Sequence, residues 1–148
     1  MEVSTTERVI TRDQVMLKQA RVGATLPAQD MERAKAWYSE KLGLTPAGED
    51  RFGAATYELS EGTGFALFQS TGRPSGTHTQ VGFDVDDVPD MVKVLKARGV
   101  KFEEYNSPPL VTVDGVAQIG EVKGAWFKDS EGNLLAIGTR TPATARRN

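Results

Sequence analysis

The sequence DMERAKAWYSEKLGL, residues Asp30–Leu44, has the pattern of one amphipathic helix with its own start and stop signals. Asp30 is a residue type that caps a helix N-terminus, and Gly43 is placed as a C-terminal stop. The apolar residues between them follow spacings of three and four, which puts them on one helix face: Ala34, Trp37, Tyr38 and Leu42. The residues before Asp30 alternate in the manner of a strand, with apolar Val22, Ala24 and Leu26.

The same pattern occurs a second time in TQVGFDVDDVPDMVKVLKARGV, residues Thr79–Val100. An alternating stretch precedes Asp87, a second candidate N-cap, and Gly99 follows the apolar helical positions as a stop. Asp30 and Asp87 are 57 residues apart, and the two stop glycines are 56 apart. Two independent landmarks therefore indicate an internal duplication.

Each predicted helix is followed by a predicted strand–turn–strand hairpin. The first hairpin spans Gly53–Ser70 and the second Gly124–Gly138, after an insertion at Asn106–Lys123 that is long enough to predict a lid-like loop. The expected fold is α+β, with two tandem βαβββ modules and the helices outside, and the bare sheet faces of the modules either bury each other or shape a cleft between them. The expected organisation is an N-terminal extension (1–20), a single domain (21–139, with modules at about 21–70 and 78–139) and a C-terminal tail (140–148).

The composition excludes several kinds of site. Among the 148 residues there is no cysteine and a single histidine, His78, so disulfides, thiolate metal sites and sites with two imidazoles from one chain are ruled out. The net charge of −2 gives no electrostatic basis for binding nucleic acid, and no apolar run is long enough to span a membrane. The absence of cysteine and of a signal-peptide pattern favours a cytoplasmic protein.

Three motifs resemble the vicinal oxygen chelate superfamily, which includes glyoxalase I, extradiol dioxygenases and bleomycin-binding proteins. They are Asp30–Leu44, Val81–Val88 (VGFDVDDV) and Trp126–Leu135 (WFKDSEGNLL). The resemblance covers about residues 21–139 and implies paired βαβββ modules that form a curled sheet around a cavity, with the helices outside. It also implies a homodimer, because members of this family commonly dimerise.

The resemblance further implies where a metal ion would bind, since metal-dependent members offer a ligand from the first and last strand of each module. Those positions fall near Gly23, at about Ala66, at Gln80 and at Ala136. Three of the four carry no donor, and one neutral amide does not hold a divalent cation against water. We therefore expect no metal centre and no cofactor.

Small residues at these positions leave room for an organic ligand. Strand alternation and the aromatic residues of the middle strands predict a ligand-binding cavity lined by Thr25, Tyr57, Ala66, Phe68, His78, Gln80, Trp126 and Ala136. Simpler interpretations stay open: Phe68 and Trp126 as core, Tyr57 as a half-buried strand residue, and His78 as a solvated strand end. The acidic residues Asp84, Asp86 and Asp87 fit a helix cap and a solvent-facing edge, and Asp129–Asn133 fits a turn.

The sequence thus predicts a metal-free small-molecule binding protein whose ligand is an apolar or aromatic metabolite. The alternative is a metal-dependent lyase, isomerase or dioxygenase with a displaced site built from His78, Gln80, Glu58 and Glu121. A third possibility is a metal-free enzyme that uses Tyr57, His78 or Glu121 as general acid or base. A purely structural or regulatory role is a fourth. No catalytic residue is predicted.

Overall fold

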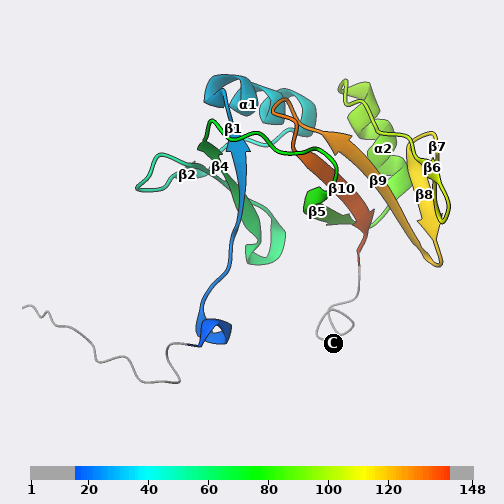
Figure 1. Cartoon of the computed structure of the whole chain (residues 1–148), viewed down its shortest axis with the longest axis horizontal. Coiled ribbons are helices and arrows are strands. Elements are labelled where there is room, and N and C mark those ends of the chain that lie inside the picture. Colours follow the sequence, from blue (N-terminus) through cyan, green and yellow to red (C-terminus); the bar gives the residue numbers. More distant parts are fainter. Residues whose placement is uncertain (1–15, 141–148) are drawn as a thin grey trace, which may run out of the picture.

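The computed structural model describes residues 16–140, which form two βαβββ modules side by side (Figure 1). A short 3₁₀ helix, η2 (Leu17–Gln19), precedes the first module. That module then consists of β1 (Ala24–Ala28), α1 (Met31–Trp37), a π-helical turn η3 (Tyr38–Leu42), β2 (Gly48–Glu49), β3 (Ala55–Glu58), a 3₁₀ turn η4 (Ser60–Gly62) and β4 (Gly64–Gln69). Its sheet has the order β1-β4-β3-β2, with β1 parallel to β4.

The second module repeats this arrangement with additional strands. It consists of β5 (Thr79–Val85), α2 (Val88–Ala97), β6 (Asn106–Ser107), β7 (Leu110–Val113), β8 (Val116–Ile119), β9 (Val122–Lys128) and β10 (Leu134–Thr139). The sheet order is β5-β10-β9-β8-β7-β6, with β5 parallel to β10. The predicted α+β fold of two duplicated modules is confirmed. The lid-like loop predicted for Asn106–Lys123 is wrong, because its residues pair as strands and widen the sheet.

Both helices begin where the sequence predicts. A carboxylate oxygen of Asp30 accepts from the backbone N–H of Arg33 at 3.0 Å, and Asp87 accepts from Asp90 N–H at 2.9 Å. The stops at Gly43 and Gly99 have φ angles of 70° and 96°, which a residue without Cβ adopts at little cost. None of the helices formed by the described residues has the length and apolar character that a membrane crossing needs.

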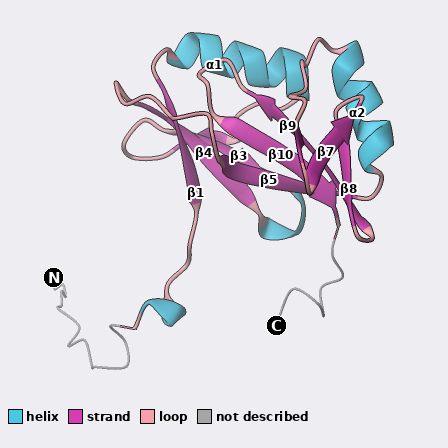
Figure 2. Cartoon of the chain, turned by 45° about the vertical axis from the view of Figure 1, so that its right-hand side comes forward, coloured by secondary structure: helices cyan, strands magenta, loops and turns pink. Residues whose placement is uncertain are grey.

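The two helices lie along one side of the strands, and the core fills the space between (Figure 2). Strand alternation divides each sheet into two faces. Phe65 and Leu67 point to the helices and are buried, whereas Ala66 and Phe68 between them lie on the opposite, helix-free face and are only partly buried. Across the two modules, the ring of Phe127 stacks on Trp37 with centroids 6.2 Å apart. The core is therefore continuous over both modules.

A buried polar turn, residues 129–133, joins the second module to the first. The side chain of Glu131 is fully buried, and its carboxylate accepts from the backbone N–H groups of Gln29 and Asp30 at 2.9 and 3.1 Å. The guanidinium of Arg33 donates to both oxygens of the same carboxylate at 2.8 and 3.0 Å. One turn of the second module thus neutralises the start of α1 in the first.

Asp129 forms the second half of this junction. Its carboxylate accepts from the hydroxyl of Tyr38 at 2.6 Å and from the backbone N–H groups of Glu131 and Asn133 at 2.8 and 2.9 Å. The amide of Asn133 donates to the carbonyl of Pro27 at 3.0 Å. Burial and the neighbouring Asp129 carboxylate raise the pKa of Tyr38, so the hydroxyl remains a donor at all physiological pH values. The hydrogen bonds with Tyr38 and Pro27 cross between the modules, whereas those among residues 129–133 lie within the turn.

The Glu131 contacts predict a pH-dependent contribution to stability. The hydrogen bond from Arg33, opposed by burial and assisted by Ser130 and the Asp30 N–H, lowers the pKa of Glu131 from 4.5 to about 2. Because the pKa of Glu131 is lower in the folded state than in the unfolded state, ionisation of its carboxyl stabilises the fold. This contribution is fully present above the ordinary carboxyl pKa and is lost as the pH falls toward the folded-state value. Glu131→Gln should therefore lower the free energy of unfolding at pH 7 by ~2–3 kcal/mol. The difference from wild type should shrink between pH 4.5 and pH 2.

Urea unfolding at several pH values measures this difference. Glu49→Gln is the matched control, because Glu49 is exposed and its carboxylate lies 4.0 Å from the ammonium group of Lys35, a long separation for an ion pair. An unchanged pH dependence in Glu131→Gln would contradict the assigned role.

The two buried tyrosines give a second prediction. Tyr38→Phe should cost ~1–2 kcal/mol of unfolding free energy, because the buried Asp129 carboxylate loses a donor. Tyr57→Phe makes the same chemical change nearby, but the hydroxyl of Tyr57 is buried without a hydrogen-bond partner in the described part of the chain. Its removal should be neutral or slightly stabilising. Thermal and urea unfolding compare the two variants, and equal losses would show that the Tyr38–Asp129 bond has no special weight.

Candidate functional site

The helix-free face of the first module has a row of small side chains across its strands. Ala66 on β4 lies directly opposite Thr25 on β1 and Thr56 on β3. Phe68, two residues further along β4, pairs with Pro27 and remains partly exposed on the same face. The row offers two hydroxyls and methyl groups beside one aromatic ring, with no charged side chain. A flat apolar molecule can contact such a surface without displacing a charge.

The helix-free face of the second module has the corresponding row. Ala136 on β10 lies between Gly82 on β5 and Trp126 on β9. The indole of Trp126 folds over Gly124, where a Cβ would lie only 3.3 Å from its ring, and its N–H donates to the Thr79 hydroxyl at 3.1 Å. Tyr105 packs edge-on to the same ring, with centroids 5.6 Å apart. Trp126 is thereby fixed as a flat wall beside Ala136.

The two rows occupy equivalent places in the duplicated fold. Thr25 and Gly82 stand at the same offset from the capping residues Asp30 and Asp87, and each pairs with the alanine of the last strand. Ala66 and Ala136 are therefore structural counterparts, in agreement with their selection from the sequence as corresponding positions. Gly23, the counterpart of Gln80, precedes β1, and a Cβ at Gly23 would have no atom of the described residues beyond its chain neighbours within 4 Å.

Gln80 is already engaged within the sheet. Its side-chain oxygen accepts from the backbone N–H of Leu134 at 3.3 Å, where the register between β5 and β10 shifts by one residue. The bulge leaves that N–H facing the side chain. The one amide expected to act as an oxygen donor for a ligand is thus occupied by a structural contact.

Two of the predicted cavity residues lie elsewhere. Tyr57 is only 2% exposed on the helix side of β3, where it stacks on Phe65 with centroids 4.8 Å apart. Its position separates it from Ala66 and Phe68, because adjacent strand residues point to opposite faces. His78 precedes β5 in an exposed loop, where its Nδ1 lies 3.1 Å from the hydroxyl of Ser75. The structure therefore brings together Thr25, Ala66 and Phe68 in one module, and Gln80, Trp126 and Ala136 in the other.

The remaining candidates do not form one cluster. Glu58 and Glu121 are exposed at strand ends of different modules. Among residues 16–140, no three side chains of His, Cys, Asp or Glu lie close enough together to hold a metal ion.

Sequence reasoning missed the importance of Asp129 and Glu131, which it interpreted as parts of a surface turn. A signal was present in the sequence. Ser-Glu-Gly occurs at residues 60–62 and again at 130–132, in the last hairpin of each module. Only the structure shows that one glutamate is buried, whereas the side chain of Glu61 is 67% exposed.

The Glyoxalase/Bleomycin resistance protein/Dioxygenase superfamily model matches residues 18–137. No curated protein matches the chain significantly. Among solved structures, UcmS2 is similar with a TM-score of 0.63 and 20% identity, over 80% of this chain and 97% of that chain. The fosfomycin resistance protein FosX from Listeria monocytogenes has a TM-score of 0.62 and 14% identity, over 87% and 98%.

A glyoxalase/bleomycin resistance protein from Catenulispora acidiphila has a TM-score of 0.55 and 22% identity, over 81% of this chain and 97% of that chain. These identities establish likeness of fold. The match to the family model over most of the chain goes further, and it agrees with the duplicated modules and their parallel first and last strands. The chain belongs to the Glyoxalase/Bleomycin resistance protein/Dioxygenase superfamily.

Proposed function

We propose that this chain is a small-molecule binding protein that holds an apolar or aromatic metabolite on the helix-free faces of its sheets, without a metal centre. The carrying observation is the pair of equivalent rows in which Ala66 and Ala136 lie among threonine, glycine and Trp126. Both rows are smooth and uncharged, and the second is bounded by a fixed indole. An aromatic ligand gains area and stacking on such a surface.

The donors within the two rows and at Gln80 beside them support a site without metal. They are the hydroxyl of Thr25, the hydroxyl of Thr56, which donates to the Gly48 carbonyl at 3.1 Å, and the amide of Gln80, which accepts from the Leu134 N–H. Divalent cations are held against water by carboxylates or imidazoles, and neither group is present in either row. The residues of the two rows therefore do not fit a divalent metal ion such as the Mn(II) of the FosX complex.

A homodimer belongs to the same proposal. Thr25 is exposed, and Ala66 and Phe68 are only partly covered in a single chain. A second copy that packs over these faces would enclose the ligand, as apolar ligands require for tight binding. A cytoplasmic location, expected from the sequence, is also part of this proposal.

The ligand site is tested by titration of a panel of aromatic natural products that includes bleomycin, with fosfomycin as a compound that has no aromatic ring. We expect at least one aromatic compound to bind and to quench Trp126 fluorescence. Trp126→Phe should raise the dissociation constant of that compound about tenfold, because stacking on the larger ring is lost. Trp37→Phe is the matched control, since Trp37 stacks on Phe127 on the helix side of the sheet.

Light scattering on the same samples should give twice the chain mass of 16.1 kDa. Failure of every compound to bind, or equal losses in the two tryptophan variants, would contradict the proposal.

The second candidate function is a metal-dependent lyase, isomerase or dioxygenase, and one neighbour favours it. A mutant of FosX was solved with Mn(II) and 1S,2S-dihydroxypropylphosphonic acid, at a TM-score of 0.55 and 15% identity. In this chain such a site would have to use His78, Glu58 or Glu121, which lie apart from one another in a single copy.

Elemental analysis distinguishes the two functions. Protein purified without a chelator should contain substoichiometric metal, and added Mn(II) should leave its melting temperature unchanged, because a metal bound to the native state would raise it. Stoichiometric metal that survives dialysis, and that is lost in His78→Ala, would establish the metal-dependent alternative instead.

A further inference from the structure

A lysine lies on the helix-free face of the second module, just beyond the row that ends at Trp126. Because alternate strand residues share a side, β9 presents Gly124, Trp126 and Lys128 on this face. Lys128 pairs with Leu134 of β10, two residues beyond the pair formed by Trp126 and Ala136. Two residues of a strand span about 7 Å. A cationic side chain therefore starts from the position next to the fixed indole, outside the uncharged row itself.

The loop before β5 restricts where the ammonium group of Lys128 lies. Gly76 in this loop has a φ angle of 73°, and a Cβ there would lie 3.3 Å from Cε of Lys128 and 3.4 Å from its Nζ. The carbonyl oxygen of Gly132 would lie 3.3 Å from the same Cβ. Since position 76 carries no side chain, the end of the lysine lies directly against the loop.

Three polar side chains of the same loop stand next to Gly76 in the chain. The hydroxyl of Ser75 lies 2.8 Å from that of Thr77 and 3.1 Å from Nδ1 of His78. All three side chains are exposed. Hydroxyl and imidazole groups donate hydrogen bonds to anions, so the loop offers donors beside the Lys128 ammonium.

Lys128 has no carboxylate partner within residues 16–140. None of the ion pairs formed by this part of the chain includes it. The carboxylate of the next residue, Asp129, is bound by the hydroxyl of Tyr38 at 2.6 Å, and Glu131 is paired with Arg33 at 2.8 Å. An anion that binds at Lys128 would therefore not have to displace an existing ion pair.

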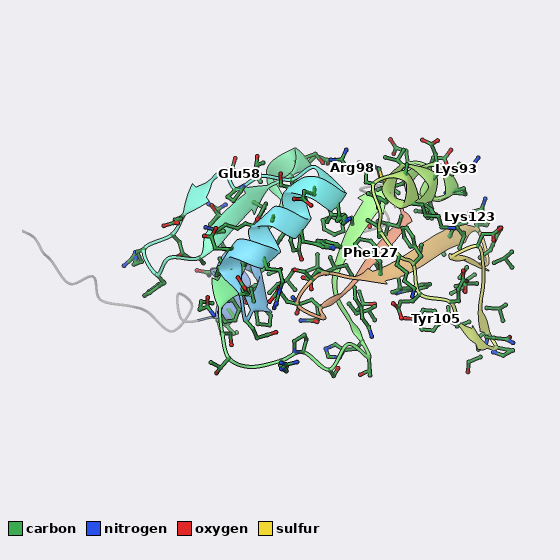
Figure 3. All side chains as sticks on the ribbon, turned by 90° about the horizontal axis from the view of Figure 1, so that it is seen from above. Glu58, Lys93, Arg98, Tyr105, Lys123 and Phe127 are labelled. Carbon is green, nitrogen blue, oxygen red and sulfur yellow. The ribbon has the colours of Figure 1, made fainter. Side chains whose placement is uncertain are left out.

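The aromatic side of this place is rigid. The indole N–H of Trp126 donates to the Thr79 hydroxyl at 3.1 Å, and the Tyr105 ring packs edge-on to the indole with centroids 5.6 Å apart. Figure 3 shows Tyr105 on the opposite side of β9 from Lys93 and Arg98 of α2. The aromatic pair and the unpaired lysine thus share the face that the helices leave open.

We propose that the ligand of this face is an aromatic carboxylate, whose ring stacks on Trp126 and whose carboxylate binds the Lys128 ammonium beside the Ser75–Thr77 turn. This inference rests on the proposed function, and it adds the charge of the ligand, which the uncharged rows leave open. A carboxylate accepts hydrogen bonds from both the ammonium and the hydroxyl groups. A cationic ligand would be repelled by Lys128, so the site should select by the sign of the charge.

The test uses three probes with the same ring system: 2-naphthylacetate, 2-(2-naphthyl)ethanol and 2-(2-naphthyl)ethylammonium. The chain has two tryptophans, Trp37 and Trp126, so ¹⁵N-labelled protein gives two indole N–H signals to follow. At low ionic strength the carboxylate should shift the Trp126 signal saturably. Its dissociation constant should be about three- to tenfold below that of the alcohol, because exposed ion pairs are modest and screened by salt. The ammonium compound should bind most weakly.

Two outcomes separate this inference from the proposed function. Equal affinities of the three probes, with saturable shifts at Trp126, would overturn the carboxylate proposal and support an aromatic site without charge selection. Absence of a saturable shift at Trp126 with every probe would contradict both.

Lys128→Met then tests the charge, since methionine keeps part of the apolar stem. It should raise the dissociation constant of the carboxylate to that of the alcohol and leave the alcohol unchanged. Lys123→Met is the matched control, because Lys123 lies on the same strand with its side chain on the opposite face, and it should change neither constant. Equal losses in the two variants would show that only the net charge of the protein matters and that no carboxylate site exists at Lys128.

Discussion

The burial of the Glu131 carboxylate against the start of α1 is the interaction on which the rest of the structure depends. A buried carboxylate is costly unless it is paired and hydrogen-bonded, and here two backbone N–H groups, a serine hydroxyl and a guanidinium satisfy it. Because the donors come mainly from the first module and the acceptor from the second, the contact fixes how the modules lie relative to each other. The same contact therefore fixes how the helix-free faces of the two sheets lie relative to each other.

The junction also shows how a duplicated sequence gives two unequal structures. Both hairpins carry Ser-Glu-Gly, yet the helical partners differ: Arg33 on α1 and Tyr38 on η3 correspond to Asp90 and Leu95 on α2. The first set of partners gives a closed polar contact, whereas at the second place a hollow of about 200 Å³ lies between Leu59 and Leu95. The two places differ at three corresponding positions, where Tyr38, Arg33 and Asp129 are matched by Leu95, Asp90 and Leu59.

Core packing restricts the helix-free faces less than it restricts the junction. Residues on these faces contribute little to the core, so packing does not determine which side chains they carry. Ala66 and Ala136 lie at equivalent places in the two sheets, and the indole of Trp126 lies against Gly124 beside Ala136. The helix side of the same strands, with Phe65, Leu67 and Phe127, provides the stability that this surface does not.

The sequence by itself determined the two modules, the capping residues Asp30 and Asp87, the stop glycines and the alternation that separates Ala66 from Phe65. These features depend on near neighbours and on the periods of helix and strand, which a single sequence displays. It did not determine the side on which Tyr57 lies, the loop position of His78 or the strands within Asn106–Lys123, because short irregular segments carry weak periodicity. Tertiary structure alone decided the burial of Glu131 and the hollow between Leu59 and Leu95. Glu131 meets residues about 100 positions earlier in the chain, and the two leucines are 36 positions apart. Their positions relative to one another depend on how the modules pack.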